Sequence, residues 1–486
     1  MRSAFALHLL LCACCGGSLA SAAPKYSAAD GFASTGGESP QAAAEALVAR
    51  VLGGAADPSL FSVTLTTPTA GVAAAEDRWS LATHADSGGV VRVSLSAMDG
   101  VGVASALQHY LKAYCHRATS WSGDNMAALP SPLPAVPAGG VSRARTGGKW
   151  SYYQNVCTVS YSMAWWRWER WEKELDWMAL RGVNLPLAFT GQEAVAQTVF
   201  RALGVTDADM GGFFSGPAFL AWYRMGNVRG VGLPAGAALP QAWIDAQWAL
   251  QLRIVGRAKA LGMTPVLPGF AGFVPAALAA AQKAALPVGA VAPSASWDDA
   301  FNGTFCCNRR VNVSTATDFY VQLGSAFISA QRKALGPLAE GLHMYNVDQY
   351  NEMAPPFAPG DLAGLAGAAT AQLASLRAAD PAATWLMQGW LFLNSDVDFW
   401  GPAQIEAYLG AVDDDAMIIL GLASDLKPLW QHTNSYYGKP FIWCMLHNFG
   451  GNVGLGGRAE EVLAEPLKAL ANASSSMVGI GITMEG

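Results

Sequence analysis

Eight short apolar runs, separated by longer segments with the apolar spacing of helices, follow one another after residue 150. Each run predicts a buried strand, and strands that alternate with helices form parallel sheets. Eight such units are typical of a (β/α)8 TIM-type barrel. The runs are Tyr152–Val159, Val183–Phe189, Met263–Pro268, Leu342–Val347, Trp385–Gly389, Met417–Leu422, Phe441–Leu446 and Met477–Thr483.

The segment after the first run has the pattern of an amphipathic helix. Trp168, Trp171, Leu175 and Met178 repeat at helical spacing, with charged residues between them. The chain contains 17 Trp residues, and Trp-rich pockets often bind sugar rings. The spacing nevertheless favours a core position for the Trp residues of this segment.

Residues 23–140 read as a separate small α/β domain. Phe61–Thr67 and Val90–Leu95 alternate like strands, and Gly100–Cys115 has one apolar helical face. The stretch Leu129–Gly140 is rich in Pro and Gly, which is the composition of a linker. We therefore place a domain boundary at residue 140 and the barrel in residues 141–486.

Residues 1–22 have the pattern of a signal peptide. Arg2 precedes a short apolar run, and Ala20–Ala22 is a small-x-small cleavage pattern. No later segment is apolar enough over sufficient length to cross a bilayer, so we expect no membrane span. The pattern predicts a protein of the secretory pathway, found in a lysosome or vacuole or outside the cell. Three Asn-x-Ser/Thr glycosylation triplets add weak support.

Charge and cysteine content exclude several classes of protein. The net charge of −6 and the sparse, unclustered Lys and Arg argue against a nucleic-acid partner. Five cysteines remain after the signal peptide, an odd number that leaves at least one free thiol. They show no metal-ligand spacing with His, so we expect no metal and no cofactor. The five are Cys115, Cys157, Cys306, Cys307 and Cys444.

Carboxylates follow several of the predicted strands. Active sites of these barrels lie at the carboxyl ends of the strands, and glycosidases need one protonated acid and one carboxylate near the anomeric carbon. Periodicity and spacing do not choose the pair, because residues on different strands meet only in the folded barrel. The candidates are Glu193, Asp348, Glu352, Asp425 and Glu485.

From Tyr152 onward the chain resembles the α-N-acetylglucosaminidase family, glycoside hydrolase family 89. The resemblance covers about two-thirds of the chain, and the matching segments are long and collinear. They are Tyr152–Thr158, Glu174–Leu180, Gly191–Ala194, Gly216–Trp222, Arg224–Asn227, Gly262–Pro268, Asn351–Met353, Gln388–Phe392, Trp400–Ile405 and Phe441–Asn452.

The resemblance implies a retaining hydrolysis of terminal α-linked N-acetylglucosamine on glycans such as heparan-type chains. The family's Asn-Glu motif falls on Asn351 and Glu352, so Glu352 is implied as the general acid/base, with a raised pKa. The closing Pro-Glu-Gly motif falls on Met484 to Gly486, which implies Glu485 as the nucleophile despite the change of Pro to Met. The two carboxyl groups are then expected about 5–5.5 Å apart.

The resemblance also implies a set of substrate-binding residues. A structural role competes for each: Cys157 reads equally well as a small buried thiol, and His447 as a core histidine. One family Trp is Ala196 here, so the sugar-facing wall is expected to differ. The implied binding residues are Asn155, Cys157, Glu193, Trp297, Asn351, Trp390 and His447.

The eighth run has no helix behind it, and the family's helical carboxyl-terminal domain is absent. We therefore expect a loosely held Glu485, partly wet apolar residues on the eighth strand, and a chain that is unstable and nearly inactive when expressed alone, as a fragment would be. Two alternatives to a working enzyme stay open. One is an inactive fragment that binds carbohydrate, and the other is a retaining glycosidase of other specificity.

Overall fold

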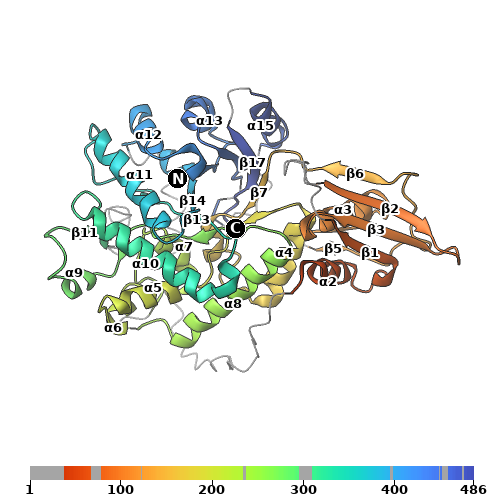
Figure 1. Ribbon diagram of the computed structural model, residues 1–486, viewed down its shortest axis with the longest axis horizontal. Helices are drawn as coiled ribbons and strands as arrows, with labels where there is room; N and C mark the ends of the chain where they lie inside the picture. Colours follow the sequence, from red (N-terminus) through yellow and green to blue (C-terminus); the bar gives the residue numbers. More distant parts are fainter. Residues whose placement is uncertain are drawn as a thin grey trace, which may run out of the picture. The chain divides into compact units, whose positions relative to one another are not determined.

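The eight apolar runs form the eight strands of one parallel sheet in the computed structural model (Figure 1). The predicted barrel is therefore confirmed strand by strand. The strands are β7 (Trp150–Tyr153), β8 (Leu185–Pro186), β9 (Leu267–Pro268), β13 (Met344–Asn346), β14 (Thr384–Gln388), β15 (Met417–Gly421), β16 (Phe441–Met445) and β17 (Met477–Ile482). The structure describes residues 38–66, 78–121, 123–233, 237–294, 309–393, 398–447, 449–450, 458–472 and 476–486.

The sheet closes on itself. Its hydrogen-bonded order is β8-β7-β17-β16-β15-β14-β13-β9, with every neighbouring pair parallel. The two ends meet through a parallel bridge between Leu187 and Val266, where Ala188 N donates to Val266 O at 2.9 Å. Each strand therefore has two partners, and all strand carboxyl ends open onto one face.

Both faces of the barrel strands are apolar, as a parallel sheet under helices requires. Leu386, Leu420 and Ile442 pack in the barrel interior. Trp385 and Phe441 belong to the cluster that packs beneath the helices. The longer barrel helices lie outside the sheet (Figure 1) and are α4 (Trp168–Leu180), α5 (Gln192–Ala202), α8 (Gln241–Ala260), α10 (Thr317–Leu335), α11 (Leu362–Arg377), α12 (Pro402–Leu409) and α15 (Ala459–Ala471).

The first run is a strand only in its first part. β7 ends at Tyr153, and Val156–Ser160 forms a short 3-10 helix, η2. Asn155 caps η2: its side chain accepts from Cys157 N, and the Thr158 hydroxyl accepts from Asn155 N. A local side-chain cap thus competes with the strand pattern of the sequence.

The small domain before the barrel has a four-stranded sheet of order β1-β3-β2-β6, packed with helices α2 (Pro40–Leu52) and α3 (Gly100–Ala113). The predicted strands appear as β1 (Phe61–Leu65) and β3 (Val91–Ala97), whereas α2 and β2 (Arg78–Ala85) were not predicted. The edge strand β6 (Val141–Ala144) pairs with β2, so the sheet runs past residue 140.

This domain shares a core with two barrel helices. Leu47 of α2 and Leu107 of α3 lie in one buried cluster with Trp171 and Leu175 of α4 and Ile254 of α8. The core role expected for the helix after the first run is therefore confirmed at Trp171.

Polar contacts also join the small domain to the barrel. The Arg50 guanidinium donates to the buried Asp176 carboxylate at 2.7 and 2.8 Å, and Val101 N donates to Leu261 O at 3.0 Å. The shared core and these polar contacts together hold the small domain against α4 and α8 of the barrel.

A small antiparallel sheet lies between β9 and α10, and the sequence did not predict it. Its strands are β10 (Phe273–Val274), β11 (Val291–Pro293) and β12 (Arg309–Val311), in the order β10-β12-β11. Arg310 of β12 lies 4.4 Å from the centre of the Tyr350 ring, and its Nη1 contacts Met353 Sδ at 3.8 Å. The insert therefore packs against the loop that follows β13.

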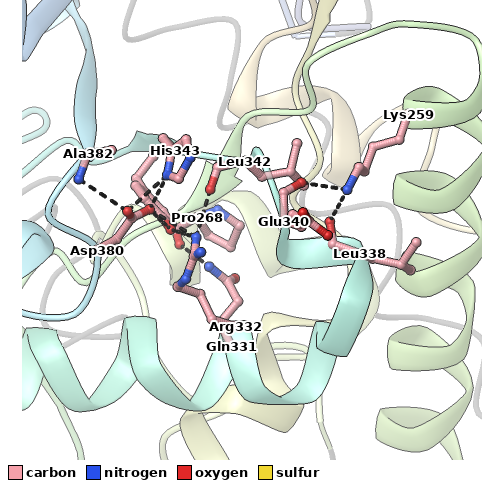
Figure 2. A network of polar contacts seen from close by, with 11 residues as sticks. Lys259, Pro268, Gln331, Arg332, Leu338, Glu340, Leu342, His343, Asp380 and Ala382 are labelled. Carbon is pink, nitrogen blue, oxygen red and sulfur yellow. Dashed lines mark hydrogen bonds and ion pairs between the residues drawn. The ribbon is translucent and has the colours of Figure 1, made fainter.

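A polar network lies where β13 and β14 begin, at the end opposite the candidate site (Figure 2). Asp380 is 3% exposed and accepts from Arg332 Nη1 at 2.9 Å and from the Tyr345 hydroxyl at 2.7 Å, and His343 Nδ1 lies 2.9 Å from it. Gln331 donates to Pro268 O at 3.0 Å. Figure 2 shows how these contacts tie α10 to the strands, which fits a stabilising role.

The eighth strand is covered in part by the chain that leads into the first. Met477, Val478, Ile480 and Ile482 are all half-buried. Gly148 lies so close that a Cβ there would be 2.6 Å from the carbonyl carbon of Val478. The solvent exposure predicted for this strand is thus reduced, because a glycine with no side chain lets the preceding chain pack directly against it.

Several sequence features lie outside the described residues: the predicted signal peptide, Trp297, Cys306 and Cys307. The described cysteines Cys115, Cys157 and Cys444 are buried free thiols. In the described part of the chain, no helix combines the length and apolar character that a membrane crossing requires.

Candidate active site

The five candidate carboxylates all follow barrel strands, at the face where the strand carboxyl ends open. Glu193 opens α5 after β8, Asp348 and Glu352 follow β13, Asp425 follows β15, and Glu485 follows β17. Their surroundings differ sharply, and those differences separate buried anchoring groups from groups that can meet a ligand.

Glu352 is held by two side-chain donors from other loops. Trp390 Nε1 donates to Oε1 at 2.9 Å, and Asn227 Nδ2 lies 3.5 Å from Oε2. The residue is half-buried, and its φ of +52° is in the left-handed region that glutamate rarely adopts. Backbone strain of this kind persists where surrounding contacts enforce it, and it clusters at functional sites.

Glu485 is held by a backbone donor. Gly450 N donates to Oε2 at 2.5 Å. Burial raises the pKa of Glu485 to about 7, the Gly450 amide acts in the opposite direction, and the charge of Glu352 raises the pKa further. The two glutamates thus interact electrostatically, and the raised pKa that the resemblance implied for Glu352 itself stays a prediction.

The backbone before Glu485 is hydrogen-bonded on two sides, and the looseness predicted for Glu485 itself stays a prediction. Asn155 Nδ2 donates to Thr483 O at 3.0 Å, and the Thr158 hydroxyl donates to Met484 O at 3.1 Å. On the other side, the Thr483 hydroxyl donates to Leu422 O at 3.0 Å. η2 and the residue after β15 together position the residues that directly follow β17.

Cys157 lies among the acidic side chains. The residue is 9% exposed, and burial raises the pKa of its thiol well above the usual range, with further increases from the charges of Glu485, Glu352 and Asp348. A neutral thiol in this place lines the site without adding charge. The structure therefore brings Cys157 together with the two glutamates.

Asp348 is a third acid beneath the site. It is 5% exposed and accepts from Gln388 N at 2.8 Å. Burial raises its pKa to about 7, against the opposing effects of Gln388 and Asn346. Asp425 is also buried, and it accepts from Leu446 N at 3.0 Å. Both carboxyls anchor strand-end backbone.

Glu193 is neutralised by a buried partner. Arg224 Nε and Nη2 donate to its two carboxylate oxygens at 3.0 and 2.8 Å, and both side chains are almost fully buried. Paired buried charges of this geometry hold structure in place, because separating them would leave a charge unsolvated. Glu193 therefore fits the supporting role that the sequence left open beside sugar binding.

The other predicted binding residues fall into two groups. Asn155 and Asn351 are buried and engaged internally, the first as the η2 cap and the second with Nδ2 3.3 Å from Met225 Sδ. Trp390 and His447 are half-buried at the strand ends, and His447 has a φ of +48°. Trp297 lies outside the described residues.

Sequence reasoning missed two groups that bind the glutamates, Asn227 and Gly450, and a third, Tyr161, that the glutamates influence electrostatically. Asn227 and Gly450 were within segments that carry the family resemblance, but nothing in their spacing linked them to Glu352 or Glu485. Tyr161 follows η2, and the charges of both glutamates raise its pKa further above its usual range, beyond the effect of burial. Its ring packs edge-on against Trp222 at 5.4 Å.

Within the described part of the chain, no three His, Cys, Asp or Glu residues form a group able to hold a metal ion. The described side chains at this face include two carboxyl groups, a neutral thiol and aromatic rings. Two interacting carboxyl groups in such a setting can share acid and nucleophile roles.

Comparison with known families covers both regions of the chain. The model of the "Alpha-N-acetylglucosaminidase (NAGLU) tim-barrel domain" matches residues 151–486, and that of the corresponding N-terminal domain matches residues 42–135. A curated human protein, "Alpha-N-acetylglucosaminidase", is 44% identical over 447 residues, which are 92% of this chain and 56% of the human protein.

Solved structures agree with these matches. A family 89 glycoside hydrolase from Clostridium perfringens, in complex with 2-acetamido-1,2-dideoxynojirmycin, has a TM-score of 0.77 and 29% identity, over 91% of this chain and 46% of its own. A second structure of a Clostridium perfringens enzyme, with its substrate GlcNAc-alpha-1,4-galactose, gives the same values. The chain thus spans about half the length of these relatives.

Proposed function

The chain belongs to the α-N-acetylglucosaminidase family, glycoside hydrolase family 89, and on that premise we propose that it hydrolyses terminal α-linked N-acetylglucosamine with retention of configuration. Glu352 is the general acid/base and Glu485 the nucleophile. The observation that carries the proposal is that these two carboxyl groups interact at the open strand ends, each held by its own donors. The other three acids are buried as anchors.

The reaction has two steps. The Glu485 carboxylate attacks the anomeric carbon while Glu352 gives its proton to the glycosidic oxygen, so the C1–O bond breaks and a glycosyl-enzyme forms. Glu352 then takes a proton from water, which attacks C1 and releases Glu485. Two carboxyl groups that interact do not ionise together readily, so the pair carries one proton. The reaction needs that proton on Glu352, although burial raises the pKa of Glu485 to about 7.

The donors suit these roles. The Gly450 amide favours the ionised form of Glu485, as a nucleophile requires. Trp390 and Asn227 orient Glu352 from two sides. For the proposed retaining mechanism, the two carboxyl groups should lie about 5–5.5 Å apart.

The substrate class comes from the relatives. One Clostridium perfringens enzyme was solved with GlcNAc-alpha-1,4-galactose as its substrate, which supports an α-linked N-acetylglucosamine at the non-reducing end for this chain. Heparan-type chains are the natural glycans that we propose, and a carbohydrate is the partner at this site. The pattern of residues 1–22 supports entry into the secretory pathway, with a lysosome, vacuole or the cell exterior as destination.

The test is turnover of an aryl α-N-acetylglucosaminide by the chain and by its Glu352→Gln and Glu485→Gln variants. We expect turnover that is lost in both variants, with an α-configured first product by NMR, and we expect this chain alone to turn over far more slowly than a longer form. Because the chain spans about half of its relatives' length, a version extended with the relatives' additional sequence is assayed alongside. Sugar binding without turnover in both forms favours a binding fragment, and turnover of other aryl glycosides alone favours another specificity.

A further inference from the structure

Phe449 presents an aromatic ring at the mouth of the site. Its side chain is 39% exposed, and its ring centre lies 6.4 Å from that of Trp390, with an angle of 54° between the planes. Among the described residues around the two glutamates, Phe449 is the exposed aromatic, since Trp390, Tyr161 and Trp222 are half-buried. The two rings form an angled apolar wall.

The position of this wall relative to the two glutamates indicates which part of a substrate it meets. Trp390 Nε1 binds Glu352 Oε1, so the wall adjoins the group that protonates the leaving oxygen in the proposed reaction. Tyr161 lies beside Glu485 instead: a Cβ on Gly450 would be 3.4 Å from the Tyr161 hydroxyl and 3.9 Å from Glu485 Oε2.

The backbone that carries Phe449 is held in place. The next residue, Gly450, donates to Glu485 at 2.5 Å. The exposed ring is therefore attached to backbone that is bonded to the site. A large apolar side chain held rigidly beside polar catalytic groups is typical of ligand-binding walls.

We propose that Phe449 and Trp390 form the surface on which the leaving-group sugar stacks, so that Phe449 selects substrates whose leaving group is a pyranose ring. The apolar C–H face of a pyranose fits an aromatic ring, and such contacts give affinity without a charged partner. This inference rests on the proposed function, because it takes the leaving-group side from the role of Glu352.

The experiment compares Phe449→Ala with wild type on two substrates. GlcNAc-α-1,4-galactose has a ring as its leaving group, whereas α-N-acetylglucosaminyl fluoride has a single atom. We expect kcat/KM for the disaccharide to fall about tenfold, mainly through KM, with little change for the fluoride. Phe449→Tyr keeps the ring and should restore the disaccharide rate, while Phe449→Leu should not.

Equal losses on both substrates would overturn the proposal, because they indicate that Phe449 acts by positioning Glu485 through Gly450. No loss on either substrate would overturn it as well. If neither the chain nor its extended version cleaves either substrate, the proposed function fails, and disaccharide affinity in the Glu352→Gln background becomes the readout. An affinity about tenfold weaker when Phe449→Ala is added then supports the stacking surface. An affinity that Phe449→Ala leaves unchanged overturns the proposal, and so does the absence of detectable disaccharide binding by Glu352→Gln alone.

Discussion

At the scale of single residues, Asp348 couples the stability of the barrel to pH. Its folded pKa of about 7 lies above the ordinary 3.8, so between these pH values the folded chain keeps a proton that the unfolded chain has lost. The free energy of unfolding therefore falls as pH rises from about 4 to about 7 and then levels. The difference corresponds to at most about 4 kcal/mol.

We predict that Asp348→Asn reduces this pH dependence and raises the melting temperature relative to wild type above pH 7. The Asn oxygen can still accept from Gln388 N, so the anchor is kept while the buried charge is removed. Melting curves from pH 4.5 to 8 measure the effect. The exposed Asp415→Asn serves as control and should follow wild type. An Asp348→Asn curve parallel to that of wild type contradicts the prediction.

Gly450 sets the second residue-scale prediction. Its φ is +56°, a conformation that costs a side-chain-bearing residue roughly 1–2 kcal/mol, and the space around a Cβ there is ordinary. Gly450→Ala should shift the turn and weaken the N–H bond to Glu485. Because that bond lowers the pKa of Glu485, its loss raises the pKa and moves the acidic limb of kcat/KM to higher pH.

Gly450→Asn is the matched variant, because Asn tolerates the left-handed region better than Ala. It should shift the acidic limb less than Gly450→Ala does. The measurement is the pH profile of kcat/KM on an aryl substrate for all three proteins. Identical acidic limbs in the three would show that the Gly450 amide does not control the ionisation of Glu485.

Site residues at strand ends could be predicted from the sequence, whereas their partners in loops could not. The acids were identifiable because the strands before them were predictable, and the family resemblance then selected Glu352 and Glu485. The donors that hold them come from loops: Asn227 follows a short helix, and Gly450 follows β16. Loop conformation depends on tertiary contacts that periodicity does not encode, so those partners were not predictable.

At the scale of elements, the link between η2 and the end of β17 decides how well Glu485 is placed. Asn155 caps η2 through Oδ1 and reaches Thr483 O through Nδ2. We predict that Asn155→Ala destabilises the protein by about 1–2 kcal/mol, from the lost cap and the unpaired carbonyl. Turnover should fall by tenfold or more, because Glu485 is two residues beyond Thr483.

Asn155→Ser separates the two roles. A serine hydroxyl can cap η2 but is too short to reach Thr483 O. We therefore expect Asn155→Ser to be nearly as stable as wild type, with turnover as low as that of Asn155→Ala. Thermal melting and kcat on the same preparations give the comparison. If Asn155→Ser restores both quantities, the bond to Thr483 has no part in positioning the nucleophile.

All eight barrel strands were predictable because buried parallel strands are apolar on both faces, as in Met417–Gly421. The insert between β9 and α10 was not, since no long apolar run marks its strands: β12 begins with Arg309 and Arg310, and β11 ends with a proline. The same holds for β7, where the apolar run continues to Val159 but the Asn155 cap ends the strand. Short or capped segments follow local side-chain bonds rather than hydrophobic pattern.

At the scale of the whole molecule, the small domain covers part of the barrel's outer surface. Leu47, Leu107, Leu175 and Ile254 are each at most 2% exposed in the cluster that α2 and α3 share with α4 and α8. Removing residues 1–145 would uncover a few hundred Å² of apolar surface on α4 and α8. At about 25 cal/mol per Å², this costs roughly 5–10 kcal/mol, which is comparable to the stability of a domain.

We therefore predict that residues 146–486 expressed alone are insoluble, or soluble only as a form that binds a hydrophobic dye and lacks a cooperative melt. A milder variant makes the same point in the full chain. Leu47→Asp places a charge in the shared core and should lower the melting temperature strongly, whereas Ala49→Asp puts the same charge on the exposed face of α2 and should not. If residues 146–486 melt cooperatively at the temperature of the full chain, the two regions are energetically independent despite their common core. If Leu47→Asp and Ala49→Asp behave alike, the cluster contributes little, and the Arg50–Asp176 pair becomes the contact that joins the regions.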